Sequence, residues 1–193
     1  MSDAVLSVGR IYFPVRTLGY GNRLGLWVRG CPRHCLGCAS PELQEASKSY
    51  IPVRKLIMDI PSMNGCDGLT ISGGEPFDQV QGVLCFAHWF LQTYNDDIMI
   101  YTGYTMEELH ARNDPYTEEL INLSAAIADG PYNKEQDHGK GLCGSENQRL
   151  YVQRYPERYS GFLTVPRKLQ ASLSNGKILM IGLPSVSTPE GRT

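Results

Sequence analysis

The sequence predicts an α/β fold built on a parallel β-sheet, and three observations support this prediction. Short apolar stretches with the composition of strands alternate with longer stretches whose apolar residues recur at helical spacing. Glycine-rich turns follow several of the expected strands. The pair Asn175-Gly176 between two apolar runs predicts a β-hairpin near the C-terminus. Repeated strand and helix units are typical of a parallel sheet covered by helices.

The expected strands are short and rich in β-branched residues. They cover residues 5–13, 23–29, 68–72, 98–101, 125–129 and 149–152, and the hairpin strands cover 168–174 and 177–183. The strand 23–29 carries Leu24, Leu26 and Val28 on one face and leads directly into Gly30-Cys31. Residues that follow a strand of such a sheet lie at its carboxyl edge, where α/β proteins usually place their sites.

The expected helices show apolar residues at helical spacing. They cover residues 53–60, 78 or 79 to 93, and 116–123, and a further helix begins after Thr105. Thr105 is expected to be an N-cap because Glu107 and Glu108 follow in the first turn, where negative charge is favoured. Residues 131–147 are polar and rich in glycine, which predicts a long loop, and loops of that length are often functional.

Length and composition indicate one domain of ordinary size. The 193 residues include 18 basic and 20 acidic side chains, for a formal charge of -2, so composition indicates neither nucleic-acid nor membrane binding. We expect a single domain over residues 1–193, with a core at about 5–152, an extension at about 153–183 and a frayed tail at 184–193. Without an apolar run long enough for a membrane span or a secretory leader, the chain is expected to be soluble and cytoplasmic.

Three of the six cysteines form a C-x3-C-x2-C motif, at Cys31, Cys35 and Cys38. Thiolates are soft ligands that suit zinc and iron–sulfur clusters, and three on one short loop can hold a single metal centre. A closed zinc site or a simple electron-transfer cluster uses four protein ligands. Spacing alone therefore leaves zinc and a four-iron cluster open, and a four-iron cluster would have one iron free to bind a small molecule.

A second motif, Ser72-Gly73-Gly74-Glu75-Pro76, follows the strand 68–72. Glycines let the main chain approach a ligand closely, and N–H and C=O groups freed there can bind an amino acid's carboxylate or ammonium. The alternative is a simple tight turn that binds no ligand, which could have the same sequence. Tyr101 and Thr102 at the end of the next strand are candidates for lining the same site or for the core. Asp129 ends a further strand and is expected to bond ribose hydroxyls or to cap a turn.

Together, the two motifs resemble those of the radical S-adenosylmethionine superfamily. The resemblance implies an open-sided, partial (β/α)6-type TIM barrel with the C-terminal β-hairpin as an extension. It also implies that Cys31, Cys35 and Cys38 bind three irons of a [4Fe-4S] cluster, whose fourth iron chelates S-adenosyl-L-methionine. By position, Gly73, Gly74 and Glu75 would line the methionine amino group. The cluster and the cofactor would carry the chemistry, so no side chain is assigned as catalytic.

Further stretches resemble the activating proteins of anaerobic (class III) ribonucleotide reductases. They are Thr102-Gly103-Tyr104-Thr105, Asp129-Gly130 and Gly144-Ser145-Glu146-Asn147-Gln148, in that order within residues 10–152. The resemblance implies reductive cleavage of the cofactor to a 5′-deoxyadenosyl radical, which abstracts a glycine Cα hydrogen from a glycyl radical enzyme, the reductase large subunit. A flavodoxin- or ferredoxin-type electron donor is implied as well.

Two departures from that family keep other functions open. Leu142-Cys143 stands where the family often has Trp-Arg, and the segment after Val152 exceeds what a minimal activase needs. The alternatives are a radical enzyme that modifies a peptide or a small metabolite, and, from a different class, a zinc-binding structural module. Of the other cysteines, Cys85 is expected in the core and Cys66 and Cys143 as free thiols in loops. His34 is expected to be an exposed loop residue.

Overall fold

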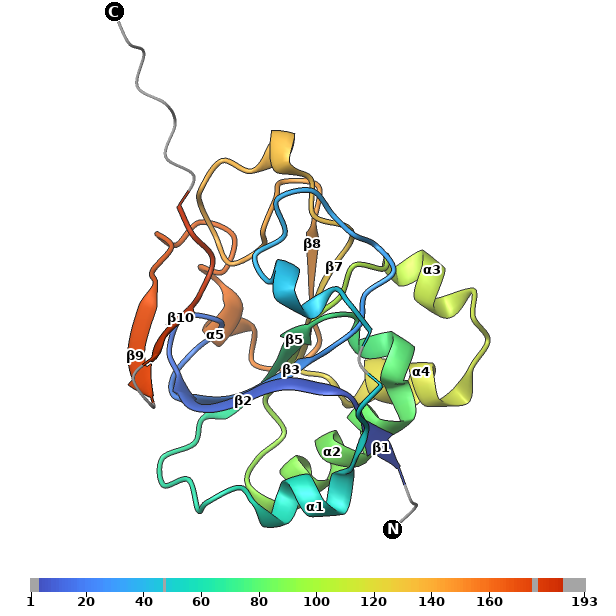
Figure 1. Cartoon of the computed structure of the whole chain (residues 1–193). Coiled ribbons are helices and arrows are strands. Elements are labelled where there is room, and N and C mark those ends of the chain that lie inside the picture. Colours follow the sequence, from blue (N-terminus) through green and yellow to red (C-terminus); the bar gives the residue numbers. More distant parts are fainter. Residues whose placement is uncertain (1–3, 47, 175–176, 186–193) are drawn as a thin grey trace, which may run out of the picture.

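A six-stranded sheet in the order β2-β3-β5-β6-β7-β8 forms the centre of the molecule (Figure 1). The computed structural model describes residues 4–46, 48–174 and 177–185. The strands are β2 Val8–Val15, β3 Arg23–Val28, β5 Gly68–Gly73, β6 Ile98–Tyr101, β7 Ala126–Asp129 and β8 Arg149–Val152. The four inner strands run parallel, and the edge strands β2 and β8 run antiparallel to their neighbours. The assignment to an open-sided, partial (β/α)6 barrel stays a prediction.

Helices cover one face of the sheet. They are α1 Val53–Met58, α2 Val80–Thr93, α3 Met106–His110 and α4 Pro115–Leu123. Alternate residues of the inner strands, such as Leu26, Ile71 and Ile100, pack in one apolar cluster with Phe86 and Phe90 of α2. Because successive side chains of a strand point to opposite faces, every second residue of these strands is available for a second core.

The C-terminal extension covers part of the opposite face. It contains α5 Pro156–Tyr159 and the antiparallel strands β9 Gln170–Ser174 and β10 Lys177–Ile181. Met99 and Ala128 pack in a cluster with Tyr159 and Phe162 of the extension. Trp27 of β3 packs in another cluster with Ile181. The extension therefore supplies part of the core and is not an appended tail.

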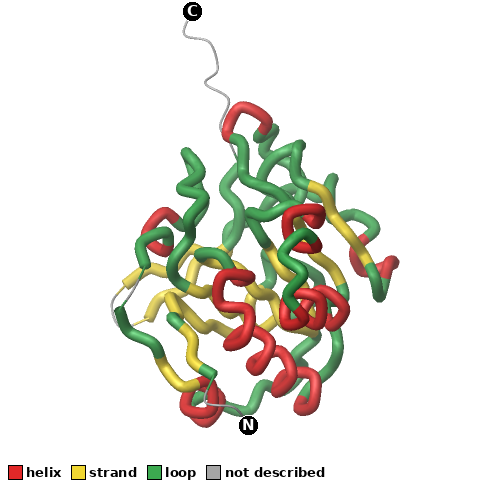
Figure 2. The backbone as a smooth tube through the Cα atoms, turned by 90° about the vertical axis from the view of Figure 1, so that its right-hand side faces the viewer, coloured by secondary structure: helices red, strands yellow, loops and turns green. Residues whose placement is uncertain are grey.

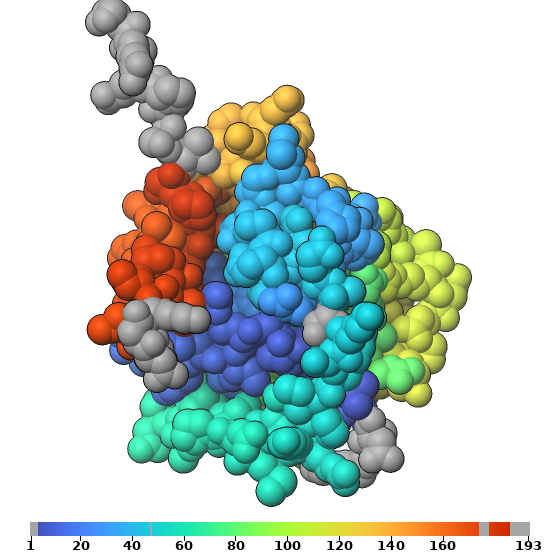
Figure 3. Space-filling view, viewed as in Figure 1, coloured from blue at the N-terminus to red at the C-terminus, as the bar shows by residue number. Residues whose placement is uncertain are grey.

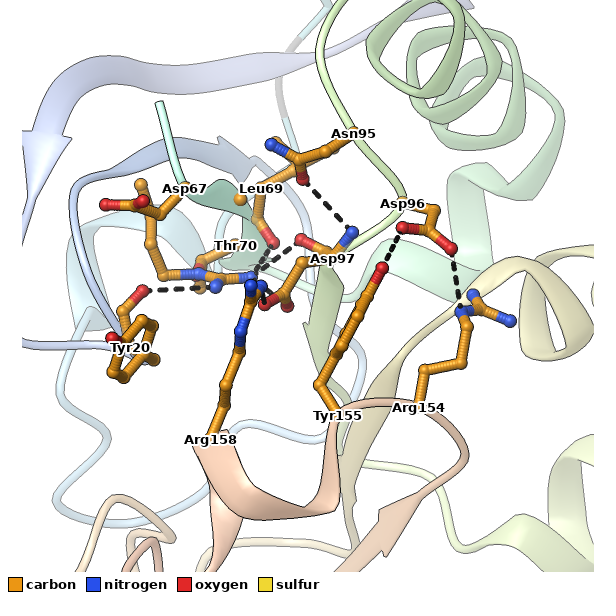
Figure 4. A network of polar contacts seen from close by, with 12 residues as sticks. Tyr20, Asp67, Leu69, Thr70, Asn95, Asp96, Asp97, Arg154, Tyr155 and Arg158 are labelled. Atoms are coloured by element: carbon orange, nitrogen blue, oxygen red, sulfur yellow. Dashed lines mark hydrogen bonds and ion pairs between the residues drawn. The ribbon is translucent and has the colours of Figure 1, made fainter. Parts of the chain in front are cut away.

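Polar contacts at the amino-terminal side of the sheet fasten the start of the extension (Figure 4). The fully buried Arg23 of β3 donates to the Asp97 carboxylate at 3.1 Å and to the Thr70 hydroxyl at 2.7 Å. Arg158 of α5 reaches the same Asp97 carboxylate at 2.8 Å. The Tyr155 hydroxyl donates to the neighbouring Asp96. A buried charge is tolerated where it is paired and hydrogen-bonded, as Asp97 is here.

Several elements match the expected ranges and others differ. The strands 98–101 and 149–152 are as predicted, and Thr105 caps α3 in a reciprocal capping box with Glu108. The expected strand 5–13 is split into β1 Val5–Leu6, which pairs with β4 Ile51–Pro52, and β2, whose pairing with β3 contains register shifts. The split lets one segment of chain serve two sheets.

Short helices account for further differences. The 3-10 helices are η1 Pro41–Leu43, η2 Pro76–Gln79 and η3 Lys134–Gln136, the last of them within the predicted loop 131–147. The hairpin strands β9 and β10 form the predicted pair, but the Asn175-Gly176 turn and most of the expected frayed tail, 186–193, lie outside the described residues. No helix of the described ranges has the length and apolar character needed to cross a membrane.

Candidate functional site

A cavity of about 150 Å³ lies where loops from successive inner strands meet. Figure 2 shows that loops make up most of the upper part of the molecule in that view, above the longer helices and most of the strands. The cavity is lined by the three motif cysteines, Ser72, Gly73, Gly74, Glu75, Tyr101, Thr102, Gly103, Gly130, Tyr132, Gly144 and Gln148, and by Asp137, Arg167, Leu183 and Pro184. The cysteine loop and the Gly-Gly-Glu-Pro loop, which are far apart in sequence, thus meet at the carboxyl edge of parallel strands, as the sequence predicted.

The cysteine loop is shaped by its main chain. Gly30 has a φ of +99°, which favours glycine, and turns the chain out of β3. The N–H groups of Gly30 and Cys31 donate to Leu43 and Gln44 at 2.8 and 2.9 Å, so the residues around η1 support the start of the loop. Cys31, Cys35 and Cys38 are half-buried, without disulfides, and all line the cavity. The predicted ligands are therefore brought together.

The arrangement of the thiols around the cavity is compatible with an iron–sulfur cluster. Among the described residues, no group of three His, Cys, Asp or Glu side chains is arranged to hold one metal ion. In an iron–sulfur cluster each thiolate binds a different iron, so the sulfurs line a cavity instead of converging on a point. Burial raises the pKa of the Cys31 thiol, and the negative charge of Glu75 raises it further. A hydrogen bond with the main chain of Arg33 lowers the pKa but does not cancel the rise. Bound iron would stabilise the thiolate.

Arg33 fastens the middle of the cysteine loop to the loop after β6 and to α3. Its guanidinium lies 4.3 Å from the ring centre of Tyr104 and 2.5 Å from the Glu108 carboxylate of α3. Arg112 lies 4.1 Å from the centre of the same ring. Cations over an aromatic ring are attracted by its quadrupole, so Tyr104 holds both arginines. His34 is exposed beside Arg33, as predicted.

The glycines of the second motif allow close approach of two loops. Gly73 has a φ of +107°, and a Cβ on Gly74 would clash with the main chain of Gly30. The N–H of Gly74 donates to Val28 at 2.7 Å, and that of Glu75 donates to Gly30 at 2.8 Å. The expectation that these N–H groups are free for a ligand is therefore wrong, because the chain's own carbonyls occupy them. They hold the two loops together instead.

Glu75 is completely buried at the wall of the cavity. Its carboxylate accepts hydrogen bonds from the N–H of Phe77 at 3.0 Å and of Gly103 at 2.8 Å, and from the Thr102 hydroxyl at 2.8 Å. Burial raises the pKa of Glu75 to about 7, although these hydrogen bonds oppose the rise. An ammonium group in the cavity would favour the charged carboxylate.

Tyr101 and Thr102, at the end of β6, differ in whether their hydroxyl groups already form hydrogen bonds. The Tyr101 hydroxyl is buried without a hydrogen-bond partner in the described part of the chain, and burial holds its pKa well above the usual value. Tyr101 lines the cavity, but its hydroxyl is buried away from it. Thr102 is already engaged, since its oxygen donates to Glu75 and accepts from the Tyr104 N–H at 3.1 Å.

Asp129 lies outside the residues that line the cavity. The buried carboxylate accepts from the Met106 N–H at the start of α3 at 2.8 Å and is paired with Arg149 at 2.6 Å. These contacts match the alternative of a capping role. The bond to ribose hydroxyls stays a prediction.

The far wall of the cavity comes from residues that the sequence did not single out. Arg167 is nearly buried and donates to the carbonyls of Gly141, Cys143, Gly144 and Pro184 at 2.8 to 3.0 Å. Its guanidinium also pairs with the Asp137 carboxylate at 2.8 Å. Arg167 therefore fastens the loop 137–144 and the segment at Leu183 and Pro184 to one another. No residue pattern signals such a role, because main-chain carbonyls occur at every position.

The remaining cysteines lie apart from the three motif thiols. Cys85 is half-buried and packs against the main core, as expected. Cys66 is half-buried in a loop, where its thiol donates weakly to the Gly68 carbonyl at 3.5 Å. Cys143 is buried in the core beneath the extension, where burial raises its pKa to about 12.

Comparison with known proteins identifies the family. A sequence model described as "4Fe-4S single cluster domain" matches residues 17–151, more than half of the chain. The chain belongs to this 4Fe-4S single-cluster family. The match supports an iron–sulfur cluster as a cofactor of the chain. The match ends before α5, so the extension lies outside it.

Several relatives of the chain share one name. The chain is 27% identical to the anaerobic ribonucleoside-triphosphate reductase-activating protein of Enterobacteria phage T4. The alignment covers 152 residues, which are 76% of the chain and 94% of the relative. The proteins of that name from Salmonella typhi and Escherichia coli K12 are each 28% identical over 151 residues, 72% of the chain and 95% of the relative. The resemblance drawn from the motifs is therefore confirmed.

Proposed function

We propose that the protein is a radical S-adenosylmethionine activase of an anaerobic ribonucleotide reductase. The observation that carries the proposal is the meeting of three thiols, the Gly-Gly-Glu-Pro loop and the buried Glu75 carboxylate in one cavity. The names of the relatives support the same partner. When bound, the cluster supplies the electron that cleaves the sulfonium cofactor to a 5′-deoxyadenosyl radical, which takes a glycine Cα hydrogen from the reductase.

The chain's own residues bind and orient the two cofactors. Cys31, Cys35 and Cys38 would hold the cluster, and a cluster with three protein ligands would keep one iron available to S-adenosyl-L-methionine. Glu75 lies buried in the wall of the same cavity, where its charge would attract the amino group. Gly73 and Gly74 keep the floor of the cavity free of side chains.

The walls of the cavity limit contact with water. Leu183 and Pro184 provide apolar surface on one side, and Tyr101 provides an aromatic side chain beside the buried Glu75. Exclusion of water protects a reactive intermediate from side reactions and strengthens electrostatic interactions within the site. Arg167 contributes indirectly because it holds Leu183 and Pro184 in place through the Pro184 carbonyl.

Anaerobic reconstitution tests the proposal. We expect about four irons per chain, release of 5′-deoxyadenosine when the protein is reduced with S-adenosylmethionine, and a glycyl radical signal in the reductase by electron paramagnetic resonance. A reductase whose reacting glycine is replaced by alanine should show no such signal. Zinc binding without iron would contradict the proposal, and 5′-deoxyadenosine release without any glycyl radical would contradict the reductase as partner and favour a peptide or small-metabolite substrate.

A further inference from the structure

A groove of about 240 Å³ runs beside the cavity and has β10 as one wall. Residues 178–183 line it without interruption, and Arg10, Trp27, Ala39 and Glu42 line the other side. Figure 3 shows the red C-terminal extension and the light-blue segment after the cysteines on the same face of the molecule. The groove is thus built from the extension and from the motif-bearing part of the chain together.

The groove and the cavity are adjacent and share part of their lining. Ala39, Ser40, Ser72, Tyr101 and Leu183 line both of them. Tyr101 therefore lies between the two, with its hydroxyl buried. A chain lying in the groove would end next to the cavity.

The edge of β10 that faces away from β9 is free. Among the described strands, β10 pairs with β9 alone. In an antiparallel pair, alternate residues direct their N–H and C=O groups away from the partner strand, so β10 presents such groups along its other edge. An edge of this kind is a template for another extended chain. Such an edge can pair with the main chain of another polypeptide.

The position of β10 is fixed while its outer side chains remain accessible. Leu179 and Ile181 pack against the cluster that contains Trp27, and the Ile181 carbonyl accepts from the Thr17 hydroxyl at 3.1 Å. Ile178 and Met180 line the groove yet are 72% and 50% exposed. Apolar side chains exposed along a fixed strand edge suit a partner that covers them on binding.

We propose that β10 binds the substrate polypeptide as an added strand and leads its reacting glycine past Tyr101 into the cavity. The inference rests on the proposed function and specifies its substrate class as an extended polypeptide segment. Strand addition combines main-chain hydrogen bonds with side-chain contacts, and glycine without a Cβ passes most closely to the residues that line both the groove and the cavity. The extension outside the family match thus provides substrate recognition.

Backbone-modified peptides test the pairing directly. The probe is a fluorescent synthetic peptide with the sequence around the reacting glycine of the partner reductase, added anaerobically to the full, cluster-loaded chain with S-adenosylmethionine. Two further peptides carry N-methyl groups at odd or at even positions. We expect one of them to bind like the unmodified peptide and the other about tenfold or more weakly, because only alternate N–H groups pair with an edge. Equal affinities for all three peptides, or no binding of any, would overturn the proposal.

Substitutions in the groove provide an independent measurement. Ile178→Asp and Met180→Asp should weaken peptide binding about tenfold, since each places a charge where an apolar contact forms. Leu173→Asp is the matched control, because Leu173 lies opposite Ile178 on β9, is 76% exposed and does not line the groove. It should bind like the unaltered chain. Unchanged binding by both groove variants, or an equal loss in the control, would overturn the role of β10.

Cofactor cleavage without peptide is measured separately in the unaltered chain. Its absence would overturn the proposed radical function, whereas the dependence of peptide affinity on the methylated positions would still decide whether β10 binds a strand. The two proposals therefore fail in different measurements.

Discussion

The Thr102 hydroxyl donates a hydrogen bond of 2.8 Å to the buried carboxylate of Glu75. This contact joins the loop after β5 to the loop after β6, and the Gly103 N–H reinforces it at 2.8 Å. The carboxylate thus fastens two loops of the cavity and also contributes the charge that we assign to binding an ammonium group. The first prediction concerns the dependence of this charge on pH.

Glu75→Gln should flatten the pH dependence of stability of the cluster-free protein. The pKa of Glu75 is raised from 4.5 to about 7 in the folded state, chiefly by burial. Its contribution is therefore fully present below pH 4.5 and is lost as the pH rises through 7, a change of roughly 3 kcal/mol in the free energy of unfolding. Urea unfolding at several pH values measures it. The exposed Glu42→Gln should keep the unaltered dependence, and an equal slope in Glu75→Gln would contradict the assignment.

Replacing any one of Cys31, Cys35 and Cys38 by alanine should remove the cluster. Two thiolates cannot replace the three that the cavity provides. Iron and sulfide content after anaerobic reconstitution, together with the visible absorption spectrum, measure the loss. Cys85→Ala is the control, because Cys85 lies on α2 and packs against the core outside the cavity. A full iron content in Cys35→Ala would show that the ligands are assigned incorrectly.

Asp97→Ala should destabilise the protein by about 3 to 5 kcal/mol because it leaves Arg23 buried without its partner. Burial acts to raise the pKa of Asp97, but Arg23, Tyr159 and Arg158 outweigh it and lower the pKa below 3.8. The stabilisation is therefore present above pH 3.8 and is lost as the pH falls below it. Urea titration at neutral pH measures the difference. Glu42→Ala, which removes an exposed pair with Arg10, should cost less than about 1 kcal/mol.

Arg167→Met should loosen the far wall of the cavity. The variant leaves the buried Asp137 and several carbonyls without their donor, at an expected cost of about 3 to 5 kcal/mol. Hydrogen exchange should become faster in residues 137–144 and at Leu183, while β5 and β6 stay protected. The neighbouring exposed Lys168→Met should leave exchange unchanged. Unaltered exchange in the loop of Arg167→Met would contradict a fastening role.

The parts of the fold that the sequence predicted are those with local signals. The strands 98–101 and 149–152 have bounded apolar runs, and Thr105 with Glu108 forms a cap whose partners are three residues apart. The direction of β2 and β8 has no such signal, because strand pairing depends on distant segments. The same holds for the split between β1 and β2, which requires β4 as a partner.

The residues of the candidate site also fall into those that a local motif predicts and those that it does not. Three cysteines and a Gly-Gly-Glu-Pro turn are recognisable because each motif needs particular side chains at fixed spacing. The roles of Arg167 and of Leu183 depend on contacts with the main chain and on the path of the extension, which no short pattern encodes. The engaged N–H groups of Gly74 and Glu75 show the limit of motif reasoning, since the loop that occupies them lies over 40 residues earlier in the chain.

The two sides of the cavity are made at very different times during synthesis. A ribosome completes the thiol loop at Cys38 and must add more than 140 further residues before Pro184 emerges to close the opposite wall. At about 5 to 20 residues per second, this leaves an interval of several seconds or more in which the thiols lack that wall. Metal delivery during translation would therefore meet an open loop, whereas delivery afterwards would have to pass the finished extension.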